Sequence, residues 1–270
     1  MTSPQTKKTG TLYGIGVGPG DPQLMTLKGA EVLGKCRQVF VPKARGEGDS
    51  AALSIAGGYL RADAEIHELV FPMITDRKEL ARRWEDSAGQ VAAVLQAGED
   101  ACFLTLGDPL LYSTYIYLLR ALRKILPEAQ AVTVPGVTAF SAAAALTDFP
   151  IGEAKELVTI VPTADDLQAL EESLDRGGTV VLMKIGKRLG KILDLLEKKK
   201  LLDQAVFVSR AGQPEQRLET DLRKLRAEGP EAGYLSIILV HAGKGKFETR
   251  NPKSETSTND QNPKVQNKSF

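Results

Sequence analysis

Several loops of this sequence combine glycine and proline with polar residues, and each directly follows a predicted strand. The first has the sequence GVGPGDP over residues 16–22, the second GDP over 107–109 and the third PGVT over 135–138. Ligands of open α/β sheets bind at the carboxyl ends of strands, which is where these loops are expected. Glycine leaves room for a ligand beside the backbone. The pattern therefore predicts that backbone comes close to a large ligand at this edge.

The first loop does not fit the glycine patterns of nucleotide-binding sites. In the dinucleotide pattern G-x-G-x-x-G the last glycine sits where helix and strand pack closely, and that position is Pro19 or Asp21 here. The second strand ends in Val-Phe-Val at 39–41 and lacks the acidic residue that binds a ribose. No Gly-Lys-Ser/Thr follows, so the loop is not a P-loop. Two interpretations remain: a tight turn without a ligand, or backbone in contact with a large ligand.

The other loops each allow a structural and a functional interpretation. Asp108 either caps the next helix, with Pro109 at its first position, or lies at a ligand site. Thr138 likewise caps a helix or bonds to a ligand. In the fourth loop, VLMK at 181–184, Met183 ends a strand, and its thioether suits either the core or the face of an adenine ring. A fifth loop, VSRAG at 208–212, follows a later strand, and no loop is decisive alone.

The remaining reactive side chains show no metal or nucleophile pattern. Cys36 and Cys102 form no C-x-x-C pair and are expected to be two buried, reduced thiols. His67 and His241 have no partner at ligand spacing, so no metal held by the protein is expected. Ser-His-Asp, Cys-His and paired-carboxylate signatures are missing too, and no catalytic residue is assigned.

Strand and helix patterns alternate along the whole sequence. Periodicity predicts strands at 11–17, 38–41, 65–70, 101–106, 131–134, 157–161, 180–183, 205–208 and 234–240. It predicts helices at 24–36, 51–59, 76–97, 111–126, 138–146, 165–174 and 189–200. This alternation is typical of an α/β fold with a mostly parallel sheet in the first half. The second half can mix strand directions, because residues 213–220 favour a hairpin arm.

A predicted hinge at 147–155, which contains Pro150 and Gly152, divides the pattern. We expect one α/β domain over 1–148 and a second over 149–246. Residues 247–270 are rich in Asn, Lys, Ser, Thr and Pro and predict a disordered tail.

The composition limits the classes of partner that the protein is expected to bind. The 270 residues are 42% hydrophobic and 26% charged, with a net charge of +1. That balance creates no general attraction to nucleic acid or to a membrane. No apolar stretch reaches the length of a bilayer, and the first ten residues lack the apolar core of a signal peptide. We therefore expect a cytoplasmic protein with no nucleic-acid or membrane partner.

Taken together and in this order, the loops resemble those of the tetrapyrrole methylases, two-domain enzymes that methylate uroporphyrinogen and the precorrins. The family's opening motif G-x-G-P-G-D-P-x-L-x-T is complete at 16–26 as GVGPGDPQLMT. Its G-D-P follows at 107–109, its V-P-G-[IV]-[ST] at 134–138 and its L-M-K at 182–184. The resemblance covers nearly the whole predicted folded part.

Four stretches resemble one branch of this family, which methylates C-20 of precorrin-2 or of cobalt-factor II in cobalamin biosynthesis. They are VFVPKARG at 39–46, FPMITDRKEL at 71–80, FLTLGDPLLYSTYIYLL at 103–119 and VPGVTAFSAAAA at 134–145. The polar tail has no counterpart in the family. The resemblance implies S-adenosylmethionine as methyl donor, a tetrapyrrole as substrate and, as is typical of the family, a homodimer.

The resemblance also implies two α/β domains of the tetrapyrrole methylase type, with S-adenosylmethionine in the cleft between them. Met183 and Ala211 would pack on the adenine, whereas the second loop would hold the methionine and ribose part. The cofactor-binding residues that it implies are Pro19, Leu106, Gly107, Asp108, Leu111, Thr138, Ala139, Met183 and Ala211. The first loop would mainly line the tetrapyrrole site.

A precorrin carries many carboxylates, so its site needs cations and backbone donors. Lys43 and Arg45 follow the second strand at the ligand edge. The substrate-binding candidates are Gly18, Asp21, Lys43, Arg45 and Tyr112, and further cations near strand ends are Arg77, Lys184 and Lys187. For each cation, a solvated surface charge is the alternative.

The chemistry of this family requires placement more than a strong base. A sulfonium is an activated electrophile and a precorrin meso carbon is enamine-like, so bringing the two into line is the main task. Asp108 and Tyr112 are candidates by position only.

Two other classes of function remain open from the sequence. The same fold could act on a different precorrin, on ribosomal RNA or on a diphthine precursor, although an RNA substrate favours a basic surface. The other class is a non-enzymatic protein that binds nucleotide-like ligands. Such a protein would not require both the cofactor loops and the branch-specific stretches.

Overall fold

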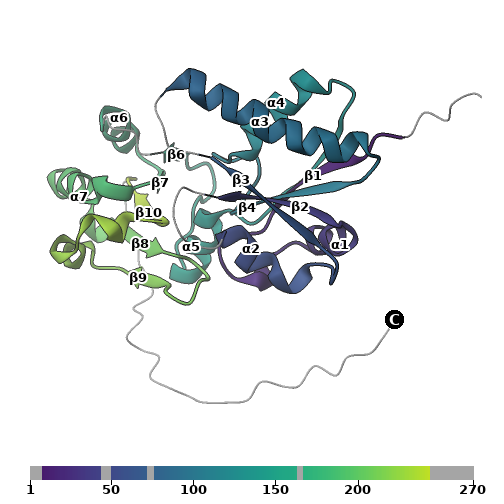
Figure 1. The fold of residues 1–270 in the computed structure, drawn as a ribbon. Helices are drawn as coiled ribbons and strands as arrows, with labels where there is room; N and C mark the ends of the chain where they lie inside the picture. The colour runs from purple at the N-terminus through teal and green to yellow at the C-terminus, as the bar shows by residue number, and fades with distance from the viewer. Residues whose placement is uncertain (1–7, 44–49, 72–75, 163–166, 244–270) are drawn as a thin grey trace, which may run out of the picture.

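The first half of the chain forms a parallel sheet. The computed structural model describes residues 8–43, 50–71, 76–162 and 167–243. Within them, five strands pair in the order β3-β2-β4-β1-β5, and every pairing is parallel, as the alternating pattern predicts (Figure 1). These strands are β1 (Thr11–Gly16), β2 (Gln38–Lys43), β3 (Glu65–Val70), β4 (Ala101–Thr105) and β5 (Gln130–Val134).

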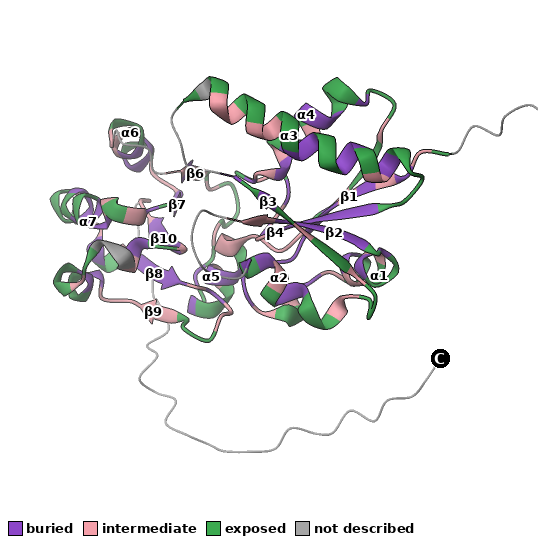
Figure 2. Ribbon diagram, viewed as in Figure 1, coloured by how far each residue is buried: buried purple, intermediate pink, exposed green. Residues whose placement is uncertain are grey.

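Helices cover both faces of this sheet. On one face α1 (Leu27–Lys35) and α2 (Ala51–Ala56) pack through Leu33 and Ile55, next to the short 3-10 helices η1 (Pro22–Leu24) and η2 (Gly57–Tyr59). On the other face α3 (Arg77–Gln96) and α4 (Tyr115–Ile125) pack through side chains such as Val91 and Leu118. The central strands β1, β2 and β4 are therefore largely buried between two helical layers, whereas the edge strands β3 and β5 are more exposed (Figure 2).

The second half forms a mixed sheet in the order β6-β7-β10-β8-β9. Its strands are β6 (Val158–Pro162), β7 (Thr179–Met183), β8 (Ala205–Ser209), β9 (Arg217–Glu219) and β10 (Ser236–His241). Only the pairing of β6 with β7 is parallel among those described, and β9 returns along β8 as the predicted hairpin arm. The expectation of mixed strand directions is thus confirmed.

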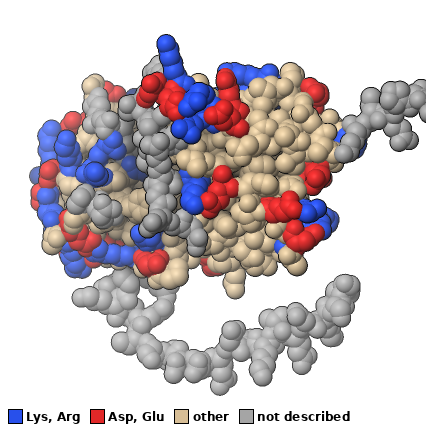
Figure 3. All heavy atoms as spheres, viewed as in Figure 1, with Lys and Arg blue, Asp and Glu red and all other residues tan. Residues whose placement is uncertain are grey.

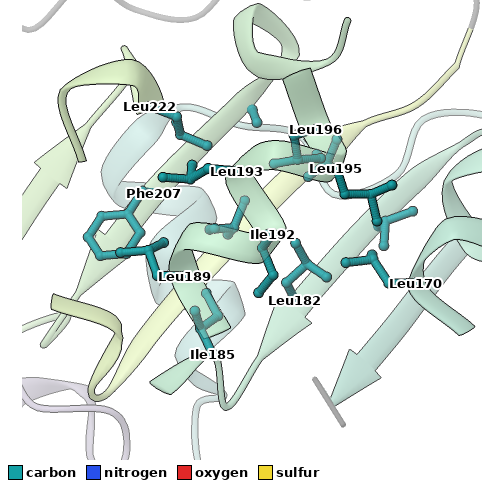
Figure 4. Close-up of a cluster of buried hydrophobic side chains, with 14 of the residues drawn as sticks. Leu170, Leu182, Ile185, Leu189, Ile192, Leu193, Leu195, Leu196, Phe207 and Leu222 are labelled. Carbon is teal, nitrogen blue, oxygen red and sulfur yellow. The ribbon is translucent and has the colours of Figure 1, made fainter. Parts of the chain in front are cut away.

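Helices on the outer face of the second sheet enclose an aliphatic core. They are α6 (Gln168–Arg176), α7 (Leu189–Lys198) and the 3-10 helices η3 (Gly186–Arg188), η4 (Leu202–Gln204), η5 (Leu222–Ala227) and η6 (Pro230–Gly233). Figure 4 shows Ile192 and Leu193 of α7 directed toward Leu182 and Phe207 of the sheet. These side chains are almost fully buried, so their removal from water stabilises the second sheet.

The inner face of the second sheet is covered by α5 (Ala139–Thr147), which directly follows the first sheet in the chain. Ala142 and Ala143 of α5 pack with Val181, Val206 and Leu239 of the second sheet. The helix thus follows β5 in sequence but packs against the second sheet. The domain boundary after residue 148 remains a prediction, and the predicted tail lies outside the described residues.

Several predicted boundaries differ from the observed ones by a few residues, and two of the differences have an identifiable reason. The strand predicted to stop before Pro42 continues to Lys43, because β2 pairs with β4 only as far as Phe40. Beyond that point the side of β2 that faces β4 is an open edge, where proline removes no ladder hydrogen bond. The helix predicted from residue 111 begins at Tyr115 instead, because Tyr112 has a φ of 54° and cannot be helical.

The two cysteines are buried and free, as predicted, and the structure brings them together. Cys36 ends α1, and Cys102 lies on β4 beside β2. The Cys36 thiol also donates to the Asp100 carbonyl oxygen at 3.3 Å. The hydrogen bond between the thiols, together with burial, raises the pKa of Cys102, so this thiol stays protonated.

The surface of the described residues carries mixed charge. On the face seen in Figure 3, Lys and Arg side chains lie among Asp and Glu. Arg226 pairs with Asp194 at 2.7 Å, and Arg223 pairs with Asp203 at 2.6 Å. Among the described helices, none is long and apolar enough to cross a membrane.

Candidate functional site

Three glycines from three different strand ends meet at the carboxyl edge of the first sheet. A Cβ atom on Gly136 would lie 2.2 Å from the carbonyl oxygen of Gly107 and 2.8 Å from the Cα of Gly16. A Cβ atom on Gly16 would lie 2.5 Å from the same carbonyl oxygen. No side chain fits in these gaps, so the loops after β1, β4 and β5 depend on glycine to pack backbone against backbone. We call these three residues the glycine junction.

The first and second loops are also hydrogen-bonded to each other. Gly107 N donates to the carbonyl oxygen of Gly18 at 2.8 Å, and both glycines have positive φ angles, of 69° and 81°. A Cβ atom on Gly107 would meet no atom within 4 Å. Gly107 therefore combines a left-handed backbone with open space beside its Cα, a combination that suits a ligand resting against the backbone.

Asp108 ties the second loop to the third. Its Oδ1 accepts a hydrogen bond from Leu110 N at 2.8 Å, and its Oδ2 accepts one from Gly136 N at 3.2 Å. The interpretation of Asp108 as the cap of the following helix is wrong, because α4 starts at Tyr115 after a longer loop. Its carboxylate instead stabilises the glycine junction.

Buried hydroxyl groups next to the second loop form hydrogen bonds that were not predicted from the sequence. Thr105 Oγ1 lies 2.8 Å from Ser113 Oγ, which accepts a hydrogen bond from Tyr115 N at 3.1 Å. The Tyr115 hydroxyl lies 3.2 Å from Thr133 Oγ1, and its ring covers Gly14. Burial raises the pKa of the Tyr115 phenol, so this group is a neutral support and not a base.

Thr138 caps α5, which confirms the interpretation of this residue as a helix cap. Its Oγ1 accepts a hydrogen bond from Ser141 N at 3.3 Å. Ala139, the first residue of α5, packs at the edge of the apolar cluster that covers the second sheet. The third loop therefore leads directly from the glycine junction to the second sheet.

Two predicted cofactor residues come from the second sheet. Met183 ends β7, and Ala211 follows β8; both belong to the apolar cluster around α5. Ala211 is buried, and its carbonyl oxygen would lie 2.2 Å from a Cβ atom on Gly20. Gln213 Nε2 also donates to the carbonyl oxygen of Pro19 at 3.3 Å. The first and fifth loops are thus in contact, although they are far apart in sequence.

The other predicted residues line the same edge with differing exposure. Leu106 and Leu111 are half-buried in the second loop, and Tyr112 is 41% exposed in a left-handed conformation. Asp21 accepts a hydrogen bond from Gln23 N at 2.8 Å and caps η1, so its role as a ligand group stays a prediction.

The predicted cations are only partly described. Lys43 follows Pro42 at the end of β2, and its Nζ lies 2.6 Å from Glu68 of β3, so it is paired in this structure. Arg45 and the side chain of Arg77 lie outside the described residues. Lys184 directly follows β7, and Lys187 belongs to η3. In the described ranges, no group of three or more His, Cys, Asp and Glu side chains is placed to hold a metal ion.

A parallel sheet whose glycine-containing loops contact a second, mixed sheet defines a two-domain α/β fold. The chain belongs to the Tetrapyrrole (Corrin/Porphyrin) Methylases, whose sequence profile matches residues 11–226. This confirms the family that the loop motifs predict.

Relatives and solved structures agree with this assignment. The chain is 36% identical over 233 residues to the cobalt-precorrin-2 C(20)-methyltransferase of Salmonella typhimurium, which covers 86% of this chain and 96% of that protein. It is 30% identical to a precorrin-2 C(20)-methyltransferase of Sinorhizobium sp, over 88% of this chain and 97% of the relative. Its fold is similar to the uroporphyrin-III C-methyl transferase of Thermus thermophilus complexed with S-adenosyl homocysteine, with a TM-score of 0.60, 20% identity and coverage of 86% and 92%.

Proposed function

We propose that this protein transfers a methyl group from S-adenosylmethionine to C-20 of precorrin-2, or of its cobalt-containing form, in cobalamin biosynthesis. The observation that carries the proposal is the similarity over nearly the whole folded chain to relatives named for this reaction. Because the relatives are named for both the metal-free and the cobalt-containing substrate, any cobalt belongs to the substrate and not to the protein.

The cofactor site that we propose is built from both sheets. Gly107 has the open space that a ligand resting on backbone requires, and Asp108 holds the surrounding loops in place. S-adenosylmethionine supplies a methyl group bonded to an activated sulfonium. Proposed contacts are Pro19, Leu106, Gly107, Asp108, Leu111, Thr138, Ala139, Met183 and Ala211. Their task is to hold the cofactor in one orientation, which lowers the entropy cost of reaction with a bound carbon nucleophile.

The tetrapyrrole site that we propose adjoins the first loop. Gly18, Asp21 and Tyr112 would line it, and Lys43 and Arg45 would bind carboxylates. A homodimer is proposed because the family resemblance implies one. A cytoplasmic location and the lack of a protein-held metal, a membrane partner or a nucleic-acid partner remain predictions from the sequence.

The decisive test locates the transferred methyl group. The purified protein is incubated anaerobically with precorrin-2 or cobalt-precorrin-2 and S-adenosylmethionine labelled with ¹³C in its methyl group. We expect the label at C-20, seen by NMR of the product. Calorimetry is expected to show that S-adenosylhomocysteine binds at about micromolar Kd. A label on another carbon would assign the protein to another precorrin, and no binding at millimolar cofactor would reject the function altogether.

The double variant Lys43→Ala with Arg45→Ala is expected to raise the tetrapyrrole KM about ten- to a thousandfold. The reason is the loss of charge-assisted bonds of roughly 1.5–3 kcal/mol each to substrate carboxylates, reduced by partial solvation. S-adenosylmethionine binding should stay near normal. Steady-state kinetics at saturating cofactor measures the effect.

Glu68→Gln is the matched control, since it removes the partner of Lys43 and keeps the lysine. Its KM should be unchanged or lower than that of the wild type. An unchanged KM in the double variant would mean that neither residue binds the substrate, that Lys43 serves only its surface pair with Glu68, and that Arg45 is a solvated surface charge.

A further inference from the structure

The carboxyl edge of the second sheet carries three strained residues. Lys184 (φ 57°), Arg210 (φ 49°) and Leu235 (φ 48°) are all in the left-handed region, which disfavours residues other than glycine. Lys184 follows β7 and Arg210 follows β8. Leu235 precedes β10, which runs antiparallel between those two strands, so all three share one edge. Strained residues of this kind gather at ligand sites, where the surrounding structure holds them in place.

Arg210 is held in a defined position at this edge. Its backbone N donates to the carbonyl oxygen of Leu235 at 2.9 Å, and its guanidinium lies 5.6 Å from the centre of the Tyr234 ring. The arginine is half-buried. Stacking on an aromatic ring orients the guanidinium, so binding a carboxylate costs less side-chain entropy.

Arg210 has no acidic partner in the described part of the chain. Most described arginines pair with a carboxylate there, as Arg223 and Arg226 do. Arg120, Arg123 and Arg176 also lack one among the described residues, but they are exposed on helices, where water solvates them. A half-buried, oriented guanidinium without an anion is poised to bind one.

The position of Arg210 indicates which anion it binds. Its neighbour Ala211 packs against Gly20 of the first loop, which places Arg210 beside the proposed tetrapyrrole site. The carboxylate of the cofactor belongs to its methionine part, which we assign to residues 106–108 of the other sheet. Ala211 and Met183 are instead the proposed contacts of the adenine end, which carries no anion.

We propose that Arg210, stacked on Tyr234, binds a side-chain carboxylate of the tetrapyrrole. The proposal rests on the proposed function and adds to it a substrate contact from the second sheet. Planar guanidinium and carboxylate groups can pair through two parallel hydrogen bonds, which fixes the orientation of the macrocycle as well as its affinity. The substrate would then be held from both sheets, by Lys43 on one side and by Arg210 on the other.

The test is the variant Arg210→Gly, which removes the guanidinium and suits the left-handed backbone. Precorrin-2 binding, followed by the change in visible absorption, should weaken about ten- to a hundredfold, or about 1.4–2.8 kcal/mol at about 1.4 kcal/mol per decade. The Tm should be equal to or higher than that of the wild type, and the Kd for S-adenosylhomocysteine should stay within about twofold. Weaker binding without lower stability distinguishes a ligand contact from a structural role.

Lys200→Gly is the matched control. Lys200 is an exposed cation with a φ of 59° that follows α7, away from the site, so glycine relieves the same strain there. This variant should bind precorrin-2 as the wild type does. Arg210→Lys keeps the charge but loses the planar group, so its affinity should lie between those of Arg210→Gly and the wild type.

Each other outcome overturns the proposal. Wild-type precorrin-2 affinity in Arg210→Gly, with or without a change in Tm, would show that the guanidinium touches no substrate. A selective loss of S-adenosylhomocysteine binding would assign Arg210 to the cofactor's carboxylate. If the wild-type protein binds neither ligand, the proposed function itself fails, which separates that failure from this one.

Discussion

Gly136→Ala is expected to lower the free energy of unfolding by about 3 kcal/mol or more. The added methyl group would lie 2.2 Å from the Gly107 carbonyl oxygen and 2.8 Å from the Gly16 Cα, and both neighbours are backbone. Backbone cannot rotate away as a side chain can, so the strand ends of β1, β4 and β5 must separate. Urea denaturation followed by circular dichroism measures the loss.

Gly107→Ala is the matched control at the same junction. Its methyl group meets no protein atom within 4 Å, so only the left-handed backbone opposes it, at about 1–2 kcal/mol. If the cofactor lies against Gly107 as proposed, this milder variant should nevertheless lose most of its S-adenosylhomocysteine affinity. Equal stability losses in the two variants would contradict the close packing, and full affinity in Gly107→Ala would remove Gly107 from the cofactor site.

Met183→Glu is expected to weaken S-adenosylhomocysteine binding by about a hundredfold or more while lowering stability much less. Met183 is half-buried at the end of β7, at the edge of the apolar cluster around α5. In the free protein a carboxylate there can still reach water. Against a bound adenine it would be a desolvated charge without a partner, at a cost of several kcal/mol.

Met183→Leu keeps the size and apolar character of the side chain and serves as the control. Isothermal calorimetry of both variants, together with their Tm values, separates binding from folding. Normal affinity in Met183→Glu would place Met183 in the core or at the surface and withdraw the adenine contact.

Features set by neighbours in the sequence could be predicted. The strands follow from their apolar periods, and Thr138 caps α5 because a threonine before a helical run accepts a backbone hydrogen bond. The glycine-rich loops could be placed at one edge, since all parallel strands end there. The family could be named because its motifs are local.

Features set by residues distant in sequence could not be predicted. Asp108 resembles a helix cap in its own segment, and only the approach of Gly136 shows that its carboxylate joins two loops. In the sequence, Tyr115 looks like an ordinary core residue of a helix. In the structure its ring lies where a Cβ atom at position 14 would be, so that position requires glycine. Cys36 and Cys102 become neighbours because β2 pairs with β4, a strand order that no local pattern encodes.

The two ends of the third loop are attached to different sheets. Gly136 is fixed to the first sheet through Asp108 and the glycine junction, whereas Thr138 begins α5, which packs on the second sheet. A relative motion of the two sheets would therefore rotate the backbone within residues 136–138, and it would also disturb the contact between the first and fifth loops. That segment is also a proposed wall of the cofactor site, so opening the molecule distorts this wall in the same movement. If S-adenosylmethionine lies against this segment as proposed, opening of the two sheets and release of the cofactor would be coupled through the third loop.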